Sequence, residues 1–199
     1  MKKQYTLRWA DYIDLSVIGA THGLSDGFSS LLVPVIALIV AELGLSAFDA
    51  GLLLSISNIA TFVLLYPVSF LADHGGRKKL ILVSGMAISS AAFFSMRWAG
   101  GFAILAVLAF VAGGGNAVYH PCGTALTAER FPDHRAFAIS FHGLMGNIGA
   151  SIMPTIQAVV ATAAGWRTAL GVCALPALIL LPLFTFRFPD GPAVSHHKP

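Results

Sequence analysis

The segment SFLADHGGRKK, residues 69–79, holds the most informative motif in the chain. It reads as the end of an apolar helix, a Gly-Gly turn and a cluster of three basic residues. Gly75 and Gly76 permit a tight reversal with positive φ. Asp73 and Arg77 are close enough in sequence to pair, and the basic cluster favours the cytoplasmic side of a membrane. The segment therefore predicts a short cytoplasmic turn between two transmembrane helices.

The composition of the whole chain agrees with a membrane setting. Of the 199 residues, 56% are hydrophobic and 11% are charged, whereas soluble domains average about 45–50% apolar and about 25% charged residues. This composition excludes a disordered chain, a nucleic-acid-binding arm and a small disulfide scaffold. Cys122 and Cys173 both lie in apolar segments and predict no disulfide framework. A polytopic membrane protein is the class that remains.

The apolar runs divide the chain into membrane spans. A helix needs about 20 mostly apolar residues to cross a bilayer, and runs such as LLVPVIALIV lack the alternation of a barrel strand. We predict an all-α membrane protein with one six-helix bundle over residues 1–188 and a disordered cytoplasmic tail over 189–199. The first run is long enough to require tilt or a kink, for which Pro34 is the candidate. The predicted spans are 15–41, 50–72, 80–98, 102–127, 136–163 and 168–187.

The basic residues predict the orientation of these spans. Ten of the twelve lie at one set of span ends, and only Arg97 and Arg167 lie at the other. The positive-inside rule then places both termini in the cytoplasm, in the cytoplasmic (inner) membrane of a prokaryote. The lipid bilayer is the expected surrounding, and the short loops leave no room for a soluble enzyme domain.

Residues 69–79 resemble the loop between spans 2 and 3 of the major facilitator superfamily, whose pattern is G-x-L-A-D-x-x-G-R-K. Ser69 replaces the usual first glycine and His74 replaces the usual basic residue. The resemblance implies that Asp73, Gly76 and Arg77 belong to a latch between the two halves of a transporter.

The first span contains a pair of ionisable residues. His22 and Asp26 are four positions apart and share one helical face. An aspartate at mid-membrane depth costs about 2.5–3.5 kcal/mol on insertion scales, so such a residue usually faces a water-filled cavity or a partner. We predict proton coupling or substrate contact at this pair, and a structural pair that fastens span 1 to a neighbour is the alternative.

Spans 4 and 5 carry further polar and sulfur-containing side chains, which we predict to line a substrate cavity. For the two asparagines, interhelical hydrogen bonding is the alternative. Glycines in span 5 predict a seam of close helix packing. The predicted cavity residues are Asn116, His120, Cys122, His142, Met145 and Asn147.

Three patterns together resemble the fosmidomycin-resistance-protein subfamily: H-x-x-x-D in span 1, G-x-x-x-x-x-H-P in span 4 and G-N-x-G-x-S-x-x-P in span 5. The resemblance covers the N-terminal six-helix half of a usual member and implies a proton-driven exporter. The chain departs from the pattern at Cys122, where glutamate is common, and at His142, where glutamine is common. Asp26 is then the acid left well inside the predicted membrane segments.

These departures raise a second hypothesis. Imidazole, thiol and thioether groups suit copper or another transition metal, and a metal-ion transporter would use them as cavity ligands. The alternative is that they act as apolar packing groups and hydrogen bonders. The candidate metal ligands are His22, His120, Cys122, His142 and Met145.

The length points to half of a transporter. A usual member has two six-span bundles around one cavity, and the chain supplies one of them. We predict a secondary active transporter that moves a small solute or ion by alternating access, as a homodimer or with a separate second half. A non-transporting membrane scaffold or partner subunit is the alternative of another class. No cofactor and no enzymatic activity are predicted, because no nucleophile–base motif or phosphate loop is present in the sequence.

Overall fold

The computed structural model describes residues 6–188, apart from the side chains of Asp73 and Gly75. Within this range the chain forms α-helices and short 3-10 turns, without strands. The helices are α1 (Trp9–Ser29), α2 (Ile36–Leu43), α3 (Ala47–Gly75), α4 (Lys78–Ser95), α5 (Phe102–Asn116), α6 (Tyr119–Arg130), α7 (Arg135–Ala174) and α8 (Ala177–Arg187), with 3-10 turns at Val33–Val35, Met96–Trp98 and Pro132–His134. The predicted tail, 189–199, lies outside the described residues.

Most of the helical length is apolar enough to cross a membrane. Four stretches meet the length and hydropathy requirement on their own: Ala47–Ala72, Lys78–Trp98, Phe102–Arg130 and Pro132–Arg187. The pair α1 and Val33–Leu43 meets it jointly, with a bend of 41° between the two parts. Pro34 lies in the 3-10 turn at this bend, where its fixed φ and missing N–H interrupt the helical hydrogen bonds.

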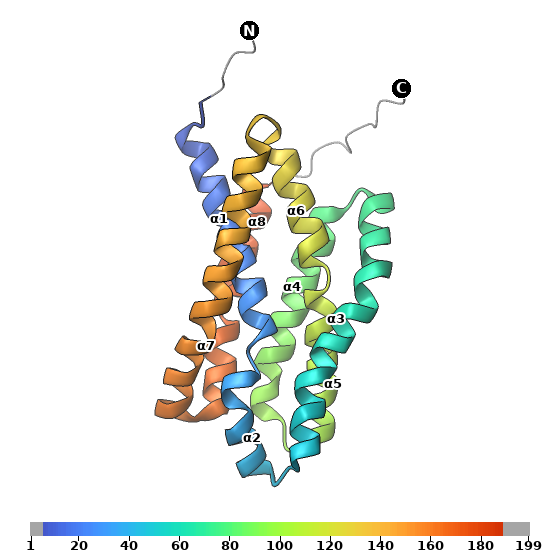
Figure 1. The fold of residues 1–199 in the computed structure, drawn as a ribbon, viewed down its shortest axis with the longest axis vertical. Helices are drawn as coiled ribbons and strands as arrows, with labels where there is room; N and C mark the ends of the chain where they lie inside the picture. The colour runs from blue at the N-terminus through green and yellow to red at the C-terminus, as the bar shows by residue number, and fades with distance from the viewer. Residues whose placement is uncertain (1–5, 189–199) are drawn as a thin grey trace.

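The longest stretch contains a reversal at Gly165. Its φ of 79° and ψ of 161° are not helical, and only glycine adopts them without a steric penalty. Arg130 precedes α7 and Arg187 ends α8, yet both bind the carboxylate of Asp14. The chain must therefore turn back between them, and α8 returns to lie against α1 (Figure 1). This turn divides the stretch Pro132–Arg187 into two helical parts.

The predicted fourth span is broken in the middle. Its helix ends at Asn116 and restarts at Tyr119. Pro121 explains the break, because a proline ring clashes with the carbonyl four residues earlier, here that of Ala117. Phe102–Arg130 still forms one apolar stretch long enough to cross a membrane, but Asn116 and His120 lie on separate helical segments of it.

One end of the bundle is fastened by charges. Asp14, whose side chain is 3% exposed, accepts hydrogen bonds from Arg130 on α6 and Arg187 on α8. Arg130 also donates to Asp11 at 3.1 Å. These contacts join the start of α1 to the ends of α6 and α8, which meet at one end of the molecule in Figure 1. Arg130 and Arg187, interpreted from the sequence only as markers of orientation, thus also join helices.

The opposite end has its own cluster around Glu42 at the end of α2. Trp166 donates its indole N–H to Glu42 at 2.7 Å, and Arg167 lies 2.6 Å from the same carboxylate. Arg167 also donates to the carbonyl of Ala99 at 2.8 Å. The chain segments on either side of this end are therefore tied together, and the two clusters position the helices between them.

The 69–79 segment forms the turn between α3 and α4. Gly76 has a φ of 61° and ends α3 in the left-handed conformation, and Arg77 is exposed just before α4. Lys78 pairs with Glu129 near the end of α6. The predicted role of Asp73 depends on a side chain outside the described part of the chain.

Helices α1 and α7 make the most intimate contact in the bundle, and this contact positions the site. A Cβ atom at Gly23 would lie 2.9 Å from the carbonyl oxygen of Met145. At Gly149 it would overlap the backbone of Gly23. Small residues at these positions let the two backbones touch, so polar groups on α1 and α7 come within bonding distance.

Candidate functional site

A cluster of ionisable side chains gathers where α1, α6 and α7 meet. His22 and Asp26 come from α1, His120 from α6 and His142 from α7. The sequence predicted all four as site residues, but their separation along the chain, up to 120 residues, gave no sign that they would meet.

The hydrogen bond of His22 fixes its tautomer. Its Nδ1 lies 2.7 Å from the backbone carbonyl oxygen of His142. A carbonyl can only accept, so Nδ1 must carry a proton and donate it. In the neutral ring Nε2 then carries a lone pair. This atom is buried, has no hydrogen-bond partner among the described residues and lies 3.4 Å from Oδ2 of Asp26. The lone pair therefore faces a carboxylate.

Asp26 lies between two imidazoles. Its Oδ1 is 3.5 Å from Nε2 of His120, and its other oxygen faces His22. The side chain of His120 is 52% exposed, that of Asp26 is 20% exposed and that of His22 is 9% exposed. Exposure thus falls from α6 towards α1, so a solute or proton can reach Asp26 from the side of His120.

Aromatic rings hold His22 in place. The ring of His142 stacks on it with centroids 3.8 Å apart, and that of Tyr119 lies nearly parallel at 5.2 Å. The Tyr119 hydroxyl donates to the carbonyl of Ile18 at 3.1 Å, which joins α6 to α1. Tyr119 was not predicted as a site residue, because an aromatic residue in an apolar span has no pattern that reveals its partner.

Gly146 is the α7 residue that faces this cluster. A Cβ atom there would lie 2.6 Å from Cε1 and 2.8 Å from Nδ1 of His22, and it would also meet the carboxylate of Asp26. Ordinary carbon contacts are about 3.5–4.0 Å. The sequence predicted a glycine packing seam in this span, and at Gly146 the close packing is against the site itself.

Asn116 joins α5 to α1 beside the cluster. It accepts a hydrogen bond from Ser25 at 2.7 Å and donates one to Ser29 at 2.9 Å. Its residue surface is 5% exposed. This geometry is that of an interhelical hydrogen bond, with Ser25 directly preceding Asp26 in the chain.

The other predicted cavity residues lie apart from the cluster. Cys122 is fully buried within the apolar core, two positions after His120 and so on a different face of α6. Met145 packs against Gly19 between α1 and α7. Asn147 is exposed on α7. Of the five predicted metal ligands, only His22, His120 and His142 come together.

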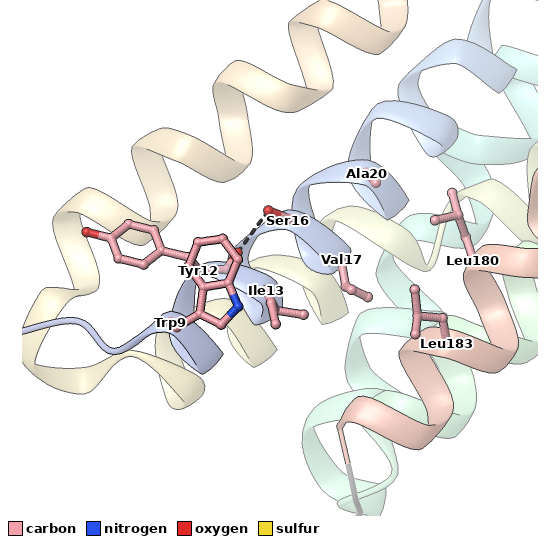
Figure 2. A pocket seen from close by; sticks show the side chains of 8 residues that line it. All are labelled: Trp9, Tyr12, Ile13, Ser16, Val17, Ala20, Leu180 and Leu183. Atoms are coloured by element: carbon pink, nitrogen blue, oxygen red, sulfur yellow. Dashed lines mark hydrogen bonds between the residues drawn. The ribbon is translucent and has the colours of Figure 1, made fainter.

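A groove of about 480 Å³ lies elsewhere, between α1 and α8. Figure 2 shows its lining, which includes Trp9, Ile13, Leu180 and Leu183. The hydroxyl of Ser16 is directed to the carbonyl of Tyr12, so it is already bonded within its own helix. The groove therefore offers little polar contact for a small solute, and the histidine–aspartate cluster remains the candidate site.

Comparison with known proteins agrees with this architecture. Residues 18–199 match the family described as Major Facilitator Superfamily. Over 156 residues the chain is 31% identical to a protein of Cupriavidus necator named "Probable sulfoacetate transporter SauU", covering 78% of this chain and 36% of that protein. It is 24% identical over 146 residues to the fosmidomycin resistance protein of Escherichia coli, again covering 36% of that relative. The chain thus spans little more than a third of these relatives.

Solved structures show the same fold. A bacterial homologue of the human lysosomal transporter Spinster, in an inward-facing and unoccupied conformation, superimposes with a TM-score of 0.83. The match covers 94% of this chain and 45% of that one, at 16% identity. A bacterial homologue of the human drug peptide transporters PepT1 and PepT2 gives a TM-score of 0.74 with 94% coverage of this chain, at 17% identity. The predicted fold class, an all-α membrane protein, is confirmed, and the chain matches a little under half of each of these longer structures.

Proposed function

The chain belongs to the Major Facilitator Superfamily, and on this premise we propose that it is a proton-coupled secondary transporter of a small solute. The observation that carries the proposal is the buried Nε2 of His22, which has no hydrogen-bond partner among the described residues and lies 3.4 Å from the carboxylate of Asp26. Ionisable groups inside membrane segments are costly and usually mark substrate or proton pathways. An integral membrane protein of this family with such a pair has the parts that proton coupling requires.

A proton between His22 and Asp26 removes the conflict between the lone pair and the carboxylate. It makes the imidazole a cation that pairs with Asp26, and its loss restores the repulsion. The half-exposed His120 gives that proton a route towards water. In our proposal, protonation changes the charge at the contact between α1 and α7 and thereby biases the rocking motion that opens the cavity to one side or the other.

We further propose that two copies assemble around the cavity. The chain covers 36% of its curated relatives, and superfamily transporters place substrate between two parallel bundles. With both termini in the cytoplasm of a prokaryotic cell, two copies would insert in the same orientation, and a two-fold axis normal to the membrane would recreate that arrangement. The turn at Gly76 and Arg77, fastened to α6 through Lys78 and Glu129, would then act as the latch between copies.

Proteoliposomes that contain the purified chain and a pH-sensitive dye test proton coupling. Sulfoacetate is the first probe, because a relative of this chain in Cupriavidus necator is named as a probable transporter of it. We expect addition of a transported solute to move protons across the membrane in the wild type. The Asp26→Asn variant should lose this movement. Asp133→Asn makes the same chemical change in the exposed turn before α7 and should retain proton movement. Proton movement that survives Asp26→Asn would contradict the proposed role of Asp26.

Cross-linking and native mass spectrometry in detergent test the assembly. We expect a dimer of the single chain. A persistent monomer that still transports contradicts the dimer, and transport that appears only with a second protein favours a separate second half. A chain that moves no solute in any assembly would instead fit the scaffold hypothesis.

Transport of a transition-metal ion is the second candidate function. It is favoured by the ligand atoms of His22, Asp26 and His120, which all lie within 4.8 Å of one another. The sulfur groups expected for copper, on Cys122 and Met145, pack elsewhere.

A further inference from the structure

We propose that His22, Asp26 and His120 form a binding site for one divalent cation of the zinc class, including cobalt and nickel, and that this ion is the cargo. The cargo assignment rests on the transport function proposed above. The site itself rests on the geometry of the three side chains and is tested separately.

The spacing of the ligand atoms fits a small cation. A tetrahedral zinc ion with bonds of about 2.0–2.1 Å places neighbouring ligand atoms about 3.3–3.4 Å apart. Nε2 of His22 is 3.4 Å from Oδ2 of Asp26, and Nε2 of His120 is 3.5 Å from Oδ1 of the same carboxylate. The three ligand atoms fall within 4.8 Å of one another. This spacing brings one ligand atom of each residue within reach of a single ion.

The hydrogen bond of His22 leaves Nε2 available as a metal ligand. Its Nδ1–H donates to the carbonyl of His142 at 2.7 Å, so the Nε2 lone pair is turned towards Asp26. Ligating histidines characteristically donate their second ring N–H to a carbonyl or carboxylate, which fixes the tautomer and the orientation of the ring. The buried Nε2 has no hydrogen-bond partner among residues 6–188, and a cation would satisfy it.

Three protein ligands leave a fourth position open. Structural zinc sites are closed by four protein ligands, whereas catalytic zinc sites have three and keep the fourth position for water or substrate. The 52% exposure of the His120 side chain puts this opening on the α6 side of the cluster. An open, partly exposed site suits an ion that must enter and leave.

The ligand types favour zinc over copper(I). Imidazole binds zinc, nickel and copper, carboxylates favour harder cations, and thiol and thioether ligands select copper(I). Cys122 lies in the apolar core and Met145 against Gly19. Asp26 takes their place in the cluster, so the predicted copper-like site becomes a nitrogen–oxygen site.

Metal binding to the purified 199-residue chain, free of any affinity tag, tests the site. The probes are Zn²⁺, measured by equilibrium dialysis, and Co²⁺, whose visible absorption reports the coordinating atoms. His196 and His197 in the C-terminal segment are replaced by alanine in all samples, because adjacent histidines can bind metals independently. We expect one ion per chain.

Two variants remove ligands, and a third serves as control. Asp26→Asn and His120→Ala should each weaken binding at least about tenfold, the loss that follows even from removing an outer-shell partner. His120 is half-exposed, so its truncation leaves no buried cavity and the variant should fold. His74→Ala removes an exposed histidine at the end of α3 and should bind like the parent.

The outcomes separate the site from the transport function. The absence of a bound ion in the parent chain, or equal affinity in the parent and His120→Ala, overturns the site. Zn²⁺ binding without Zn²⁺ uptake into dye-loaded proteoliposomes overturns the cargo assignment. If sulfoacetate addition moves protons while no ion binds, the proton-coupled transporter is supported and the metal site is refuted. If neither sulfoacetate nor Zn²⁺ moves protons, proton-coupled transport of these two probes is refuted, whatever the binding result.

Discussion

Replacing Gly146 by alanine tests the contact on which the candidate site depends. The added methyl group would lie 2.6 Å from Cε1 of His22, about 1 Å inside an ordinary contact of about 3.5–4.0 Å. The ring of His22 has little freedom to retreat, because it stacks on His142 and donates to the carbonyl of that residue. The methyl group must therefore displace α7 or break this hydrogen bond.

The magnitude follows from two opposing effects. Overpacking a well-packed interior costs about 1–3 kcal/mol, while exchanging glycine for alanine inside a helix gains about 0.8–1.0 kcal/mol. Gly143→Ala isolates the second effect, since a Cβ atom at Gly143 on the same helix meets nothing within 4 Å. We therefore expect Gly146→Ala to be about 1–3 kcal/mol less stable than Gly143→Ala.

Thermal unfolding of both variants in the same detergent measures this difference. For a chain of this size 1 kcal/mol corresponds to about 2–4 °C in Tm, so the two variants should differ by about 2–12 °C. Equal Tm values would refute the close approach of α1 and α7 at the site. Gly146→Ala should also weaken Zn²⁺ binding, because His22 cannot keep its orientation, whereas Gly143→Ala should not.

Two further substitutions probe the buried polar contacts. Asp14→Asn leaves Arg130 and Arg187 without their shared carboxylate. Because the two arginine side chains are 35% and 36% exposed, we expect the free energy of unfolding to fall by about 1–3 kcal/mol, less than the 3–5 kcal/mol of a fully buried pair. An unchanged Tm would show that the cluster does not fasten the helix ends. Asn116→Ala removes the partner of two serine hydroxyls and should lower the free energy of unfolding by about 1–3 kcal/mol. Asn147→Ala, at an exposed position, should change the Tm little. Similar effects at both positions would contradict the interhelical hydrogen bonds of Asn116.

Local sequence patterns were sufficient for the fold class. Hydropathy over about 20 residues reflects the thickness of the bilayer, and the order of residues 69–79 is enough to indicate the family that the comparison then found. These features are encoded by neighbouring residues. The orientation of the termini follows from the charge distribution and remains a prediction.

The breaks in the helices were only partly predictable. Pro34 and Pro121 mark positions where a backbone N–H is missing, so a bend could be expected near each. A turn at Gly165 was expected more directly, because this residue lies between the predicted spans 136–163 and 168–187. Its positive φ follows from the packing of the segments on either side, which Glu42 fastens through Trp166 and Arg167.

The sequence by itself determined which chemical groups the candidate site contains. His22 and Asp26 are paired by helical periodicity, and His120 and His142 are conspicuous as imidazoles in apolar segments. Only the tertiary structure decided that Asp26 lies between His22 and His120, that His22 donates to the carbonyl of His142, and that Cys122 faces the core. The physical reason is that these contacts join residues about 100 positions apart, so they depend on how α1, α6 and α7 pack. That packing is set by close backbone contacts at glycines, and no local pattern identifies the partners of those glycines.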